Sequence, residues 1–301
     1  MIKQPGRILL TLRFVTAIAL CMAAPASAAS SPSVFAGTMA EMTYVELEEA
    51  TRTGAVALWA LGAIEEHGPH LPLATDVYIP SAQLLQVQRQ LAARKISSVI
   101  VPAYYWSVNQ VTGSFPGSID IRPEVMTELM TDVFRSLSKA GFKRVFCITG
   151  HYDAAHSRAI IEAVRRANRA SDIKAYYVVP EPLALRLGLK AEDAGFLLVD
   201  APANAAPAHP DLHAGEAETS MLLSVAPDAV RKQLIPSLKP TDLTPKDVEV
   251  WRKGYDHAKR VTPLGYLGDP ARADAAAGST RLAQQAEAFA DAIATSIAGA
   301  R

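Results

Sequence analysis

Short apolar segments alternate with amphipathic segments over much of the chain, and this order constrains the fold more than any other feature. Runs rich in apolar and β-branched residues are typical of strands buried on both faces of a sheet. Four such runs are present: 55–61, 97–104, 143–149 and 174–179. Three segments between them have the apolar spacing of helices: 79–95, 123–140 and 154–170. The alternation predicts an α/β fold with a mostly parallel sheet, in which sites form at the carboxyl ends of strands.

The carboxyl-terminal part of the chain is less regular. We expect a helix at 216–225, an alanine-rich closing helix at 282–298, and an alanine- and proline-rich loop at 202–210. Residues 236–280 are rich in turn formers and predict no defined element. No repeat or domain linker interrupts the order, so residues 29–301 are expected to form a single domain.

Composition excludes several classes of protein. The chain has 30 Lys and Arg against 30 Asp and Glu, and half of its residues are apolar. Nucleic-acid binding needs a basic surface and disorder needs low hydrophobicity, so neither class fits. Two cysteines cannot form a disulfide framework. Cys147 lies within the predicted strand 143–149, where we expect it to be buried.

Residues 1–28 have the features of an export signal. Three basic residues, Lys3, Arg7 and Arg13, lie among the first 13 positions, residues 14–24 are almost wholly apolar, and the small-x-small sequence Ala-Ser-Ala ends at Ala28. The alternative, an uncleaved membrane anchor, is disfavoured because a spanning helix needs roughly 20 apolar residues and this run stops at Pro25. We therefore predict a cleaved signal peptide, a slightly acidic mature protein in the periplasm, and no membrane association after cleavage.

Histidines and carboxylates gather in three short segments, two of which directly follow predicted strands. Six of the seven histidines lie in or beside 65–76, 150–156 and 213–220. Imidazole and carboxylate are common ligands of Zn, Mn and Fe, and a carboxylate can bridge two ions. Paired ions of this kind activate water and polarise a carbonyl oxygen. The three segments together therefore suggest a hydrolytic metal centre.

The first of these segments can form half of such a centre. Glu65 and His67 are two residues apart, so in extended backbone their side chains point the same way, and a loop with two prolines can return Asp76 to them. The alternative is that Asp76 caps the following helix and that each histidine is hydrogen-bonded within a loop. The spacing alone leaves both interpretations open.

Several motifs resemble those of the creatininase (creatinine amidohydrolase) family. The longest is GAIEEHGPHLPLATD at 62–76, and the others are FPGSI at 115–119, TGHYD at 149–153, HAGEAETS at 213–220, and GYLGDP at 265–270 with Gly278 after it. The resemblance runs from about residue 42 to the end of the chain. It implies a three-layer α/β/α fold and a site for two divalent metal ions, Zn and/or Mn, with Fe as a further option.

The resemblance also implies a ligand set, position by position. Glu65, Asp76 and His151 match the ligands of one ion. His67, Asp76 and Glu218 match the ligands of the other, with Asp76 as the bridge. This choice favours Glu218 over Glu216, which spacing alone could not do.

Three further positions match residues that handle substrate and protons in the family. Tyr152 is expected to contact the substrate, and Asp153 stands where creatininase has a proton-handling glutamate that is one methylene longer. His213 matches the histidine that protonates the leaving nitrogen. The sequence departs from creatininase in its pocket, because no tryptophan lies between Asp153 and His213; the only tryptophans are Trp59, Trp106 and Trp251.

These motifs predict an exported amidohydrolase that cleaves a C–N bond of a small, cyclic, creatinine-like amide. Two alternatives remain: a metal-dependent peptidase or formamide hydrolase of the same family, and an exported metal- or ligand-binding protein without turnover. By resemblance to the family, we also expect a homo-oligomer, with a hexamer as the favoured state.

Overall fold

The computed structural model describes Met1 and residues 35–190, 192–200 and 210–299. Its contacts separate the first 34 residues from a compact unit that begins at Phe35, and only this unit is described below. All but the first residue of the predicted signal peptide at 1–28, and all but the last residue of the predicted loop at 202–210, lie outside the described residues.

Strands and helices alternate through the first part of the unit, as predicted. The elements of this part are α1 (Tyr44–Arg52), β1 (Val56–Leu61), α2 (Thr75–Ala93), β2 (Ser98–Tyr104), α3 (Pro123–Lys139), β3 (Arg144–Thr149), α4 (Ala154–Ala170), β4 (Lys174–Pro180), α5 (Glu181–Leu187) and β5 (Phe196–Val199). The helices that follow β5 are α6 (Glu216–Val225), α7 (Pro245–Trp251), α8 (Tyr255–Val261) and α9 (Ala275–Ala298).

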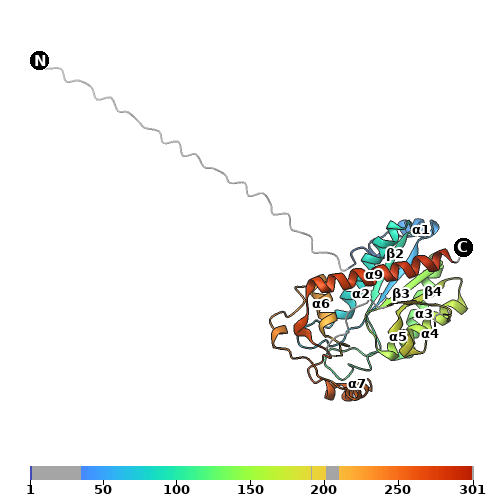
Figure 1. Cartoon of the computed structure of the whole chain (residues 1–301). Coiled ribbons are helices and arrows are strands. Elements are labelled where there is room, and N and C mark those ends of the chain that lie inside the picture. The colour runs from blue at the N-terminus through green and yellow to red at the C-terminus, as the bar shows by residue number, and fades with distance from the viewer. Residues whose placement is uncertain (2–34, 191, 201–209, 300–301) are drawn as a thin grey trace. The chain divides into compact units, whose positions relative to one another are not determined.

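The five strands form one parallel sheet in the order β2-β1-β3-β4-β5 (Figure 1). β1 and β3 are neighbours, with Leu61 paired to Thr149 at their carboxyl ends. The segments that follow these two strands therefore leave the sheet side by side. These are the segments at 65–76 and 150–156 in which histidines and carboxylates gather.

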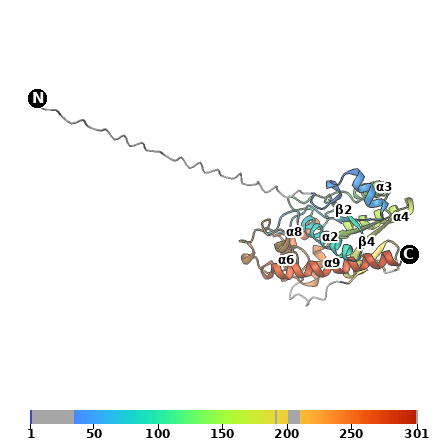
Figure 2. The same ribbon diagram turned by 90° about the horizontal axis from the view of Figure 1, so that it is seen from above.

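Helices cover both faces of the sheet, which confirms the three-layer α/β/α prediction. Alternate residues of β1 enter different cores: Ala57 and Trp59 pack with residues of α3 and α4, whereas Leu58 and Ala60 pack with residues of α2 and α9. Figure 2 shows the strands lying between α3 and α4 on one side and α9 on the other. Because both faces are buried, the strands are continuously apolar.

Some boundaries differ from those predicted. The helix predicted at 79–95 begins at Thr75 and ends at Ala93. The prediction started too late because the first turn, which includes Thr75 and Asp76, lacks apolar periodicity. The closing helix begins at Ala275 instead of 282, since Asp274 caps it by accepting a hydrogen bond from Ala277 N. Five elements were not predicted: α1, α5, β5, α7 and α8. Most of them are short, and α7 and α8 lie in the turn-rich region that predicted no element.

Two glycines allow close backbone contacts that shape the site. A Cβ at Gly62 would lie 2.3 Å from Asp76 O, so only glycine lets the end of β1 touch the start of α2. A Cβ at Gly278 would lie 2.0 Å from Ser220 O, where α9 crosses α6. Within the described residues, no helix combines the length and apolar character needed to cross a membrane.

Candidate functional site

The loop after β1 folds back on itself and brings three predicted ligands together. Glu65 N donates a hydrogen bond to Leu73 O at 3.0 Å, which closes the loop, and Asp76 follows in the first turn of α2. Ala74, and not Asp76, is the N-cap residue of this helix. The alternative in which Asp76 caps the helix is therefore wrong, and its buried carboxylate is free to face the site.

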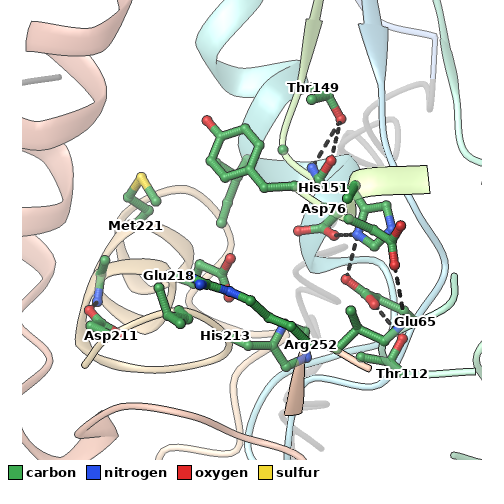
Figure 3. Close-up of a pocket in the computed structure, with 18 of the residues that line it drawn as sticks. Glu65, Asp76, Thr112, Thr149, His151, Asp211, His213, Glu218, Met221 and Arg252 are labelled. Carbon is green, nitrogen blue, oxygen red and sulfur yellow. Dashed lines mark hydrogen bonds and ion pairs between the residues drawn. The ribbon is translucent and has the colours of Figure 1, made fainter. Parts of the chain in front are cut away.

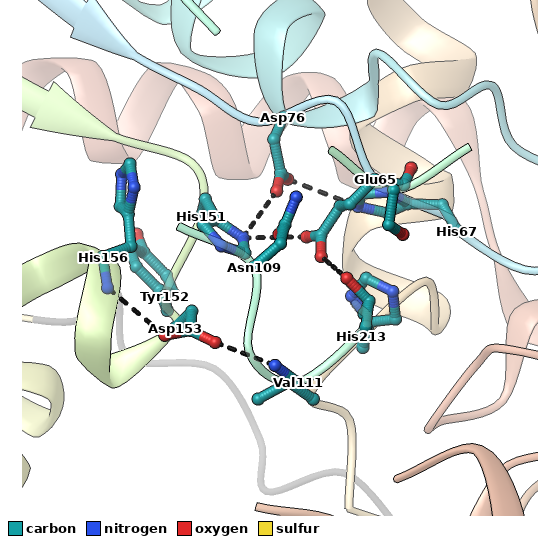
Figure 4. Close-up of polar contacts among 12 residues, drawn as sticks. Glu65, His67, Asp76, Asn109, Val111, His151, Tyr152, Asp153, His156 and His213 are labelled. Atoms are coloured by element: carbon teal, nitrogen blue, oxygen red, sulfur yellow. Dashed lines mark hydrogen bonds and ion pairs between the residues drawn. The ribbon is translucent and has the colours of Figure 1, made fainter. Parts of the chain in front are cut away.

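His151 arrives from the end of the neighbouring strand β3. Its Nδ1 lies 2.8 Å from Glu65 Oε1 and 3.2 Å from Asp76 Oδ2 (Figure 4). Its Nε2 donates to Val108 O at 2.9 Å, which orients the ring and leaves Nδ1 facing the carboxylates. Burial opposes protonation of His151, but Glu65 and Asp76 outweigh it and raise its pKa well above the ordinary value.

His67 faces the other oxygen of Asp76. Its Nε2 lies 3.3 Å from Asp76 Oδ1 and 3.7 Å from Glu218 Oε2, and makes no hydrogen bond to any described residue. Its Nδ1 donates to Glu65 O at 3.2 Å. Burial and the nearby Asp76 raise the pKa of Glu218 to about 7. This corner of the site thus has an orphaned, buried nitrogen beside two carboxylates, the donor set expected around a cation.

The five predicted ligands form two groups of three that share Asp76. Ligand atoms of Glu65, Asp76 and His151 lie within 4.8 Å of one another, and so do those of His67, Asp76 and Glu218. These are the two ligand sets implied by the family resemblance. A third group consists of Glu65, His67 and His213. The residues present therefore fit divalent metal ions in donor type, burial and number.

Neighbouring residues hold these ligands in place. Thr112 Oγ1 donates to Glu65 Oε2, and Ala214 N donates to Glu218 Oε2 at 2.6 Å. Such outer hydrogen bonds orient ligands and tune their affinity for metal. Glu216, in contrast, pairs with Arg272 at 3.4 Å and belongs to none of the three groups.

His213 lies beside the ligands. Its Nε2 is 2.8 Å from Glu66 O and 3.4 Å from Glu66 Oε1, and its ring centroid is 4.4 Å from that of His67. Burial lowers its pKa, but Glu65 and Glu66 outweigh this and raise the pKa well above the ordinary value. Because Nε2 faces two oxygens, it carries a hydrogen, and Nδ1 is left for other partners.

Asp153 has a structural partner for each of its oxygens. Its Oδ1 caps α4 by accepting from Ala155 N at 2.7 Å and from His156 N at 3.3 Å, and its Oδ2 accepts from Val111 N at 3.0 Å (Figure 4). Tyr152 lines the same cavity and is 41% exposed. The structure therefore places both predicted residues at the site, and shows a capping role for Asp153 that was not predicted.

A cavity of about 320 Å³ is lined by four of the predicted ligands, Glu65, Asp76, His151 and Glu218 (Figure 3). Its lining includes residues that were not predicted, among them Gln110, Arg186, Trp251 and Arg252. Trp251 comes from α7, and its ring centroid lies 6.3 Å from that of His213. An aromatic wall is thus present, although it comes from a different part of the chain than the creatininase tryptophans.

Two further buried histidines, His70 and His156, are hydrogen-bonded and belong to none of the ligand groups. His70 Nε2 lies 2.9 Å from Thr219 Oγ1, and burial lowers the pKa of His70 to about 4. His156 Nε2 lies 3.2 Å from Thr149 Oγ1. For these two residues, the interpretation as hydrogen-bonded histidines is confirmed.

Comparison with known proteins identifies the family. The family described as "Creatininase: Creatinine amidohydrolase" matches residues 40–293. The chain belongs to the creatininase family. The resemblance noted in the sequence is thereby confirmed, and the match covers every predicted ligand.

Two curated relatives of this creatininase-family chain have different names. One is the mycofactocin precursor peptide peptidase of Mycolicibacterium smegmatis, 29% identical over 79% of this chain and 84% of that protein. The other is the creatinine amidohydrolase of Pseudomonas putida, 28% identical over 72% of this chain and 82% of that protein. The relatives therefore support a hydrolase but leave the substrate open.

Solved structures agree with this family assignment. A creatinine amidohydrolase (creatininase) crystal structure is similar with a TM-score of 0.65 and 25% identity, covering 88% of this chain and 98% of that one. A mutant creatininase described as the Zn-Zn type has a TM-score of 0.62 and 25% identity, covering 87% and 98%. The chain is thus a creatininase-family amidohydrolase with buried side-chain clusters that can hold metal ions.

Proposed function

We propose that this protein uses two divalent metal ions, Zn and/or Mn, to add water to a C–N bond of a small amide, with a cyclic, creatinine-like amide as the first candidate. The observation that carries the proposal is the position of Asp76. One of its oxygens faces His67 and Glu218, and the other faces His151 beside Glu65. A carboxylate held in this way is suited to join two ion sites.

Each proposed ion has three ligands from this chain. Glu65, Asp76 and His151 would hold one, and His67, Asp76 and Glu218 the other. Bound there, divalent ions would polarise the substrate carbonyl and supply hydroxide near neutral pH. Four of these ligands, Glu65, His67, Asp76 and His151, are buried, which strengthens the charge interactions among them.

The chain's own residues would then move the protons. His213 Nε2 is held by Glu66, so Nδ1 is the atom that can deliver a proton to the leaving nitrogen. Asp153 is fixed by three backbone N–H groups, but a carboxylate has about four acceptor positions. It can therefore still accept a proton through a water molecule. Tyr152, on the cavity wall, would contact the substrate.

A peptide bond is the second candidate substrate. Several relatives 28–30% identical to this chain are named as peptide peptidases, and a cavity of about 320 Å³ can take the terminal residues of a peptide. A panel of creatinine, hydantoins, lactams and short peptides separates the two classes of substrate.

The test combines metal loading with mutation. Protein loaded with Zn or Mn should hydrolyse a member of the panel, and Asp76→Ala should lose this activity. Glu216→Ala is the matched control, since Glu216 is a nearby carboxylate outside the ligand groups. Activity that survives both Asp76→Ala and removal of metal by a chelator would contradict the proposal, and binding without any turnover would favour the non-catalytic alternative.

Export and assembly complete the proposal. Residues 1–28 would direct the chain to the periplasm and be removed, and the mature protein would assemble into a homo-oligomer, with a hexamer favoured. Amino-terminal sequencing of periplasmic protein and light scattering after size-exclusion chromatography test these two points.

A further inference from the structure

Three arginines from different parts of the chain line the cavity together with the proposed ligands. Arg281 comes from α9 and has a nearby opposite charge in Asp211. Arg186 belongs to α5, and Arg252 directly follows α7. Neither Arg186 nor Arg252 forms an ion pair with a carboxylate in the part of the chain that the structure describes.

Arg186 is fixed against the cavity wall. Its Nη2 donates to Tyr152 O at 2.6 Å, which ties the guanidinium to the residue between His151 and Asp153. Asp153 attracts Arg186 at longer range, but its carboxylate already accepts three backbone hydrogen bonds. The other N–H groups of Arg186 remain available to a ligand.

Arg252, at the carboxyl end of α7, lines the same cavity. Figure 3 shows its side chain extended across the cavity in the region of Glu218 and His213. The surrounding protein and the positive charge of Arg252 lower the pKa of Arg186 below its ordinary value. Two guanidinium groups that repel each other across one cavity cost free energy, and a bound anion would offset that cost.

We propose that Arg186 and Arg252 bind a carboxylate of the substrate, so that the site takes amides that carry an anionic group. This inference rests on the proposed amide hydrolysis and specifies its substrate class. Guanidinium groups suit this task because their planar N–H pairs match the two oxygens of a carboxylate. The shared chemistry is an amide with a nearby carboxylate, either a small cyclic amido acid or the carboxyl terminus of a peptide.

The experiment uses matched pairs that differ only in the charged group. The cyclic pair is 5-oxoproline and 5-oxoprolinamide, and the peptide pair is N-acetyl-alanyl-alanine and its carboxyl-terminal amide. Hydrolysis by the metal-loaded protein is measured together with calorimetric binding to both metal-loaded and chelator-treated protein. The chelator-treated protein is included because a carboxylate can also bind a metal ion directly.

We expect the acid of at least one pair to bind about 10- to 100-fold more tightly than its amide, as for a charge-assisted hydrogen bond. The pair that shows this preference identifies the source of the carboxylate. In Arg186→Gln and Arg252→Gln, the ratio of acid affinity to amide affinity should fall towards one. Arg158→Gln should keep it, because Arg158 is an exposed arginine of α4 outside the cavity lining.

Two results would overturn the inference: equal binding of acid and amide in both pairs, or a preference that survives both arginine variants. Failure of the proposed function gives a different result. In that case no compound is hydrolysed, yet the acids still bind more tightly through the two arginines. Hydrolysis of neutral amides without any preference for acids would leave the hydrolase proposal intact and remove only the substrate class.

Discussion

Replacing Asp76 with asparagine should remove both metal ions, and not only one. Asp76 belongs to both ligand groups, with Oδ1 3.3 Å from His67 Nε2 and Oδ2 3.2 Å from His151 Nδ1. Asparagine keeps the size of the side chain but offers one neutral oxygen in place of two charged ones. Each ion site therefore loses one of its three protein ligands and a full negative charge.

The expected size of the effect follows from known perturbations of metal sites. Loss of an outer hydrogen-bond partner alone lowers metal affinity 10- to 100-fold, so loss of a shared ligand should lower it by about 100-fold or more at both sites, or about 2.8 kcal/mol each. Glu65→Gln and Glu218→Gln each alter a single group of the proposed pair, so each should weaken mainly one ion.

Metal content after equilibration at a fixed free Zn concentration, measured by mass spectrometry, distinguishes these outcomes. We expect two ions per chain in the wild type and in the control Glu216→Gln, about one in Glu65→Gln and Glu218→Gln, and fewer than one in Asp76→Asn. An Asp76→Asn protein that retains one tightly bound ion would refute the bridging role.

Three further predictions concern stability and reactivity. Gly278→Ala should lower the free energy of unfolding by about 2 kcal/mol or more, because its Cβ would lie 2.0 Å from Ser220 O. Gly299→Ala is the control and should change thermal unfolding little, because its Cβ would lie 3.5 Å from Thr295 O. Cys147 is fully buried, and burial raises the pKa of its thiol, so a thiol reagent should modify it only at the rate of unfolding. Burial opposes the charge on His67, but the surrounding carboxylates raise its pKa to about 8. Without metal, protonated His67 therefore stabilises the folded state, fully below pH 6.5 and less as the pH rises through 8. Urea unfolding in the presence of a chelator should show a lower free energy of unfolding at pH 9 than at pH 6.

Local sequence was sufficient to predict the strands and the ligand segments. The first strand and the Glu65 to Asp76 segment are adjacent in the chain, and the parallel arrangement of β1 and β3 follows from the alternation of elements. His151 therefore had to lie near Glu65 once the sheet formed. The capping role of Asp153 was not predicted, although Asp153 directly precedes the predicted helix 154–170 and Asp is a common N-cap residue.

The walls of the cavity could not be predicted in the same way. Trp251 and Arg252 lie in a region of turn formers whose position depends on packing against the rest of the molecule. Arg186 lies on α5, a helix of one to two turns that begins directly after β4. No periodic pattern in such short segments indicates which side chains face a site built from other parts of the chain.

The proposed metal ligands and several residues that line the cavity come from different elements, so the two sets can change independently in evolution. The proposed metal ligands come from the loops that follow β1 and β3 and from the first turns of α2 and α6. Arg186 lies on α5, and Trp251 and Arg252 lie at the carboxyl end of α7; neither helix contributes a ligand. Substitutions in the segments that carry these three residues can change what enters the cavity and leave the proposed ligands in place, so proteins with the same ligand set can diverge in substrate.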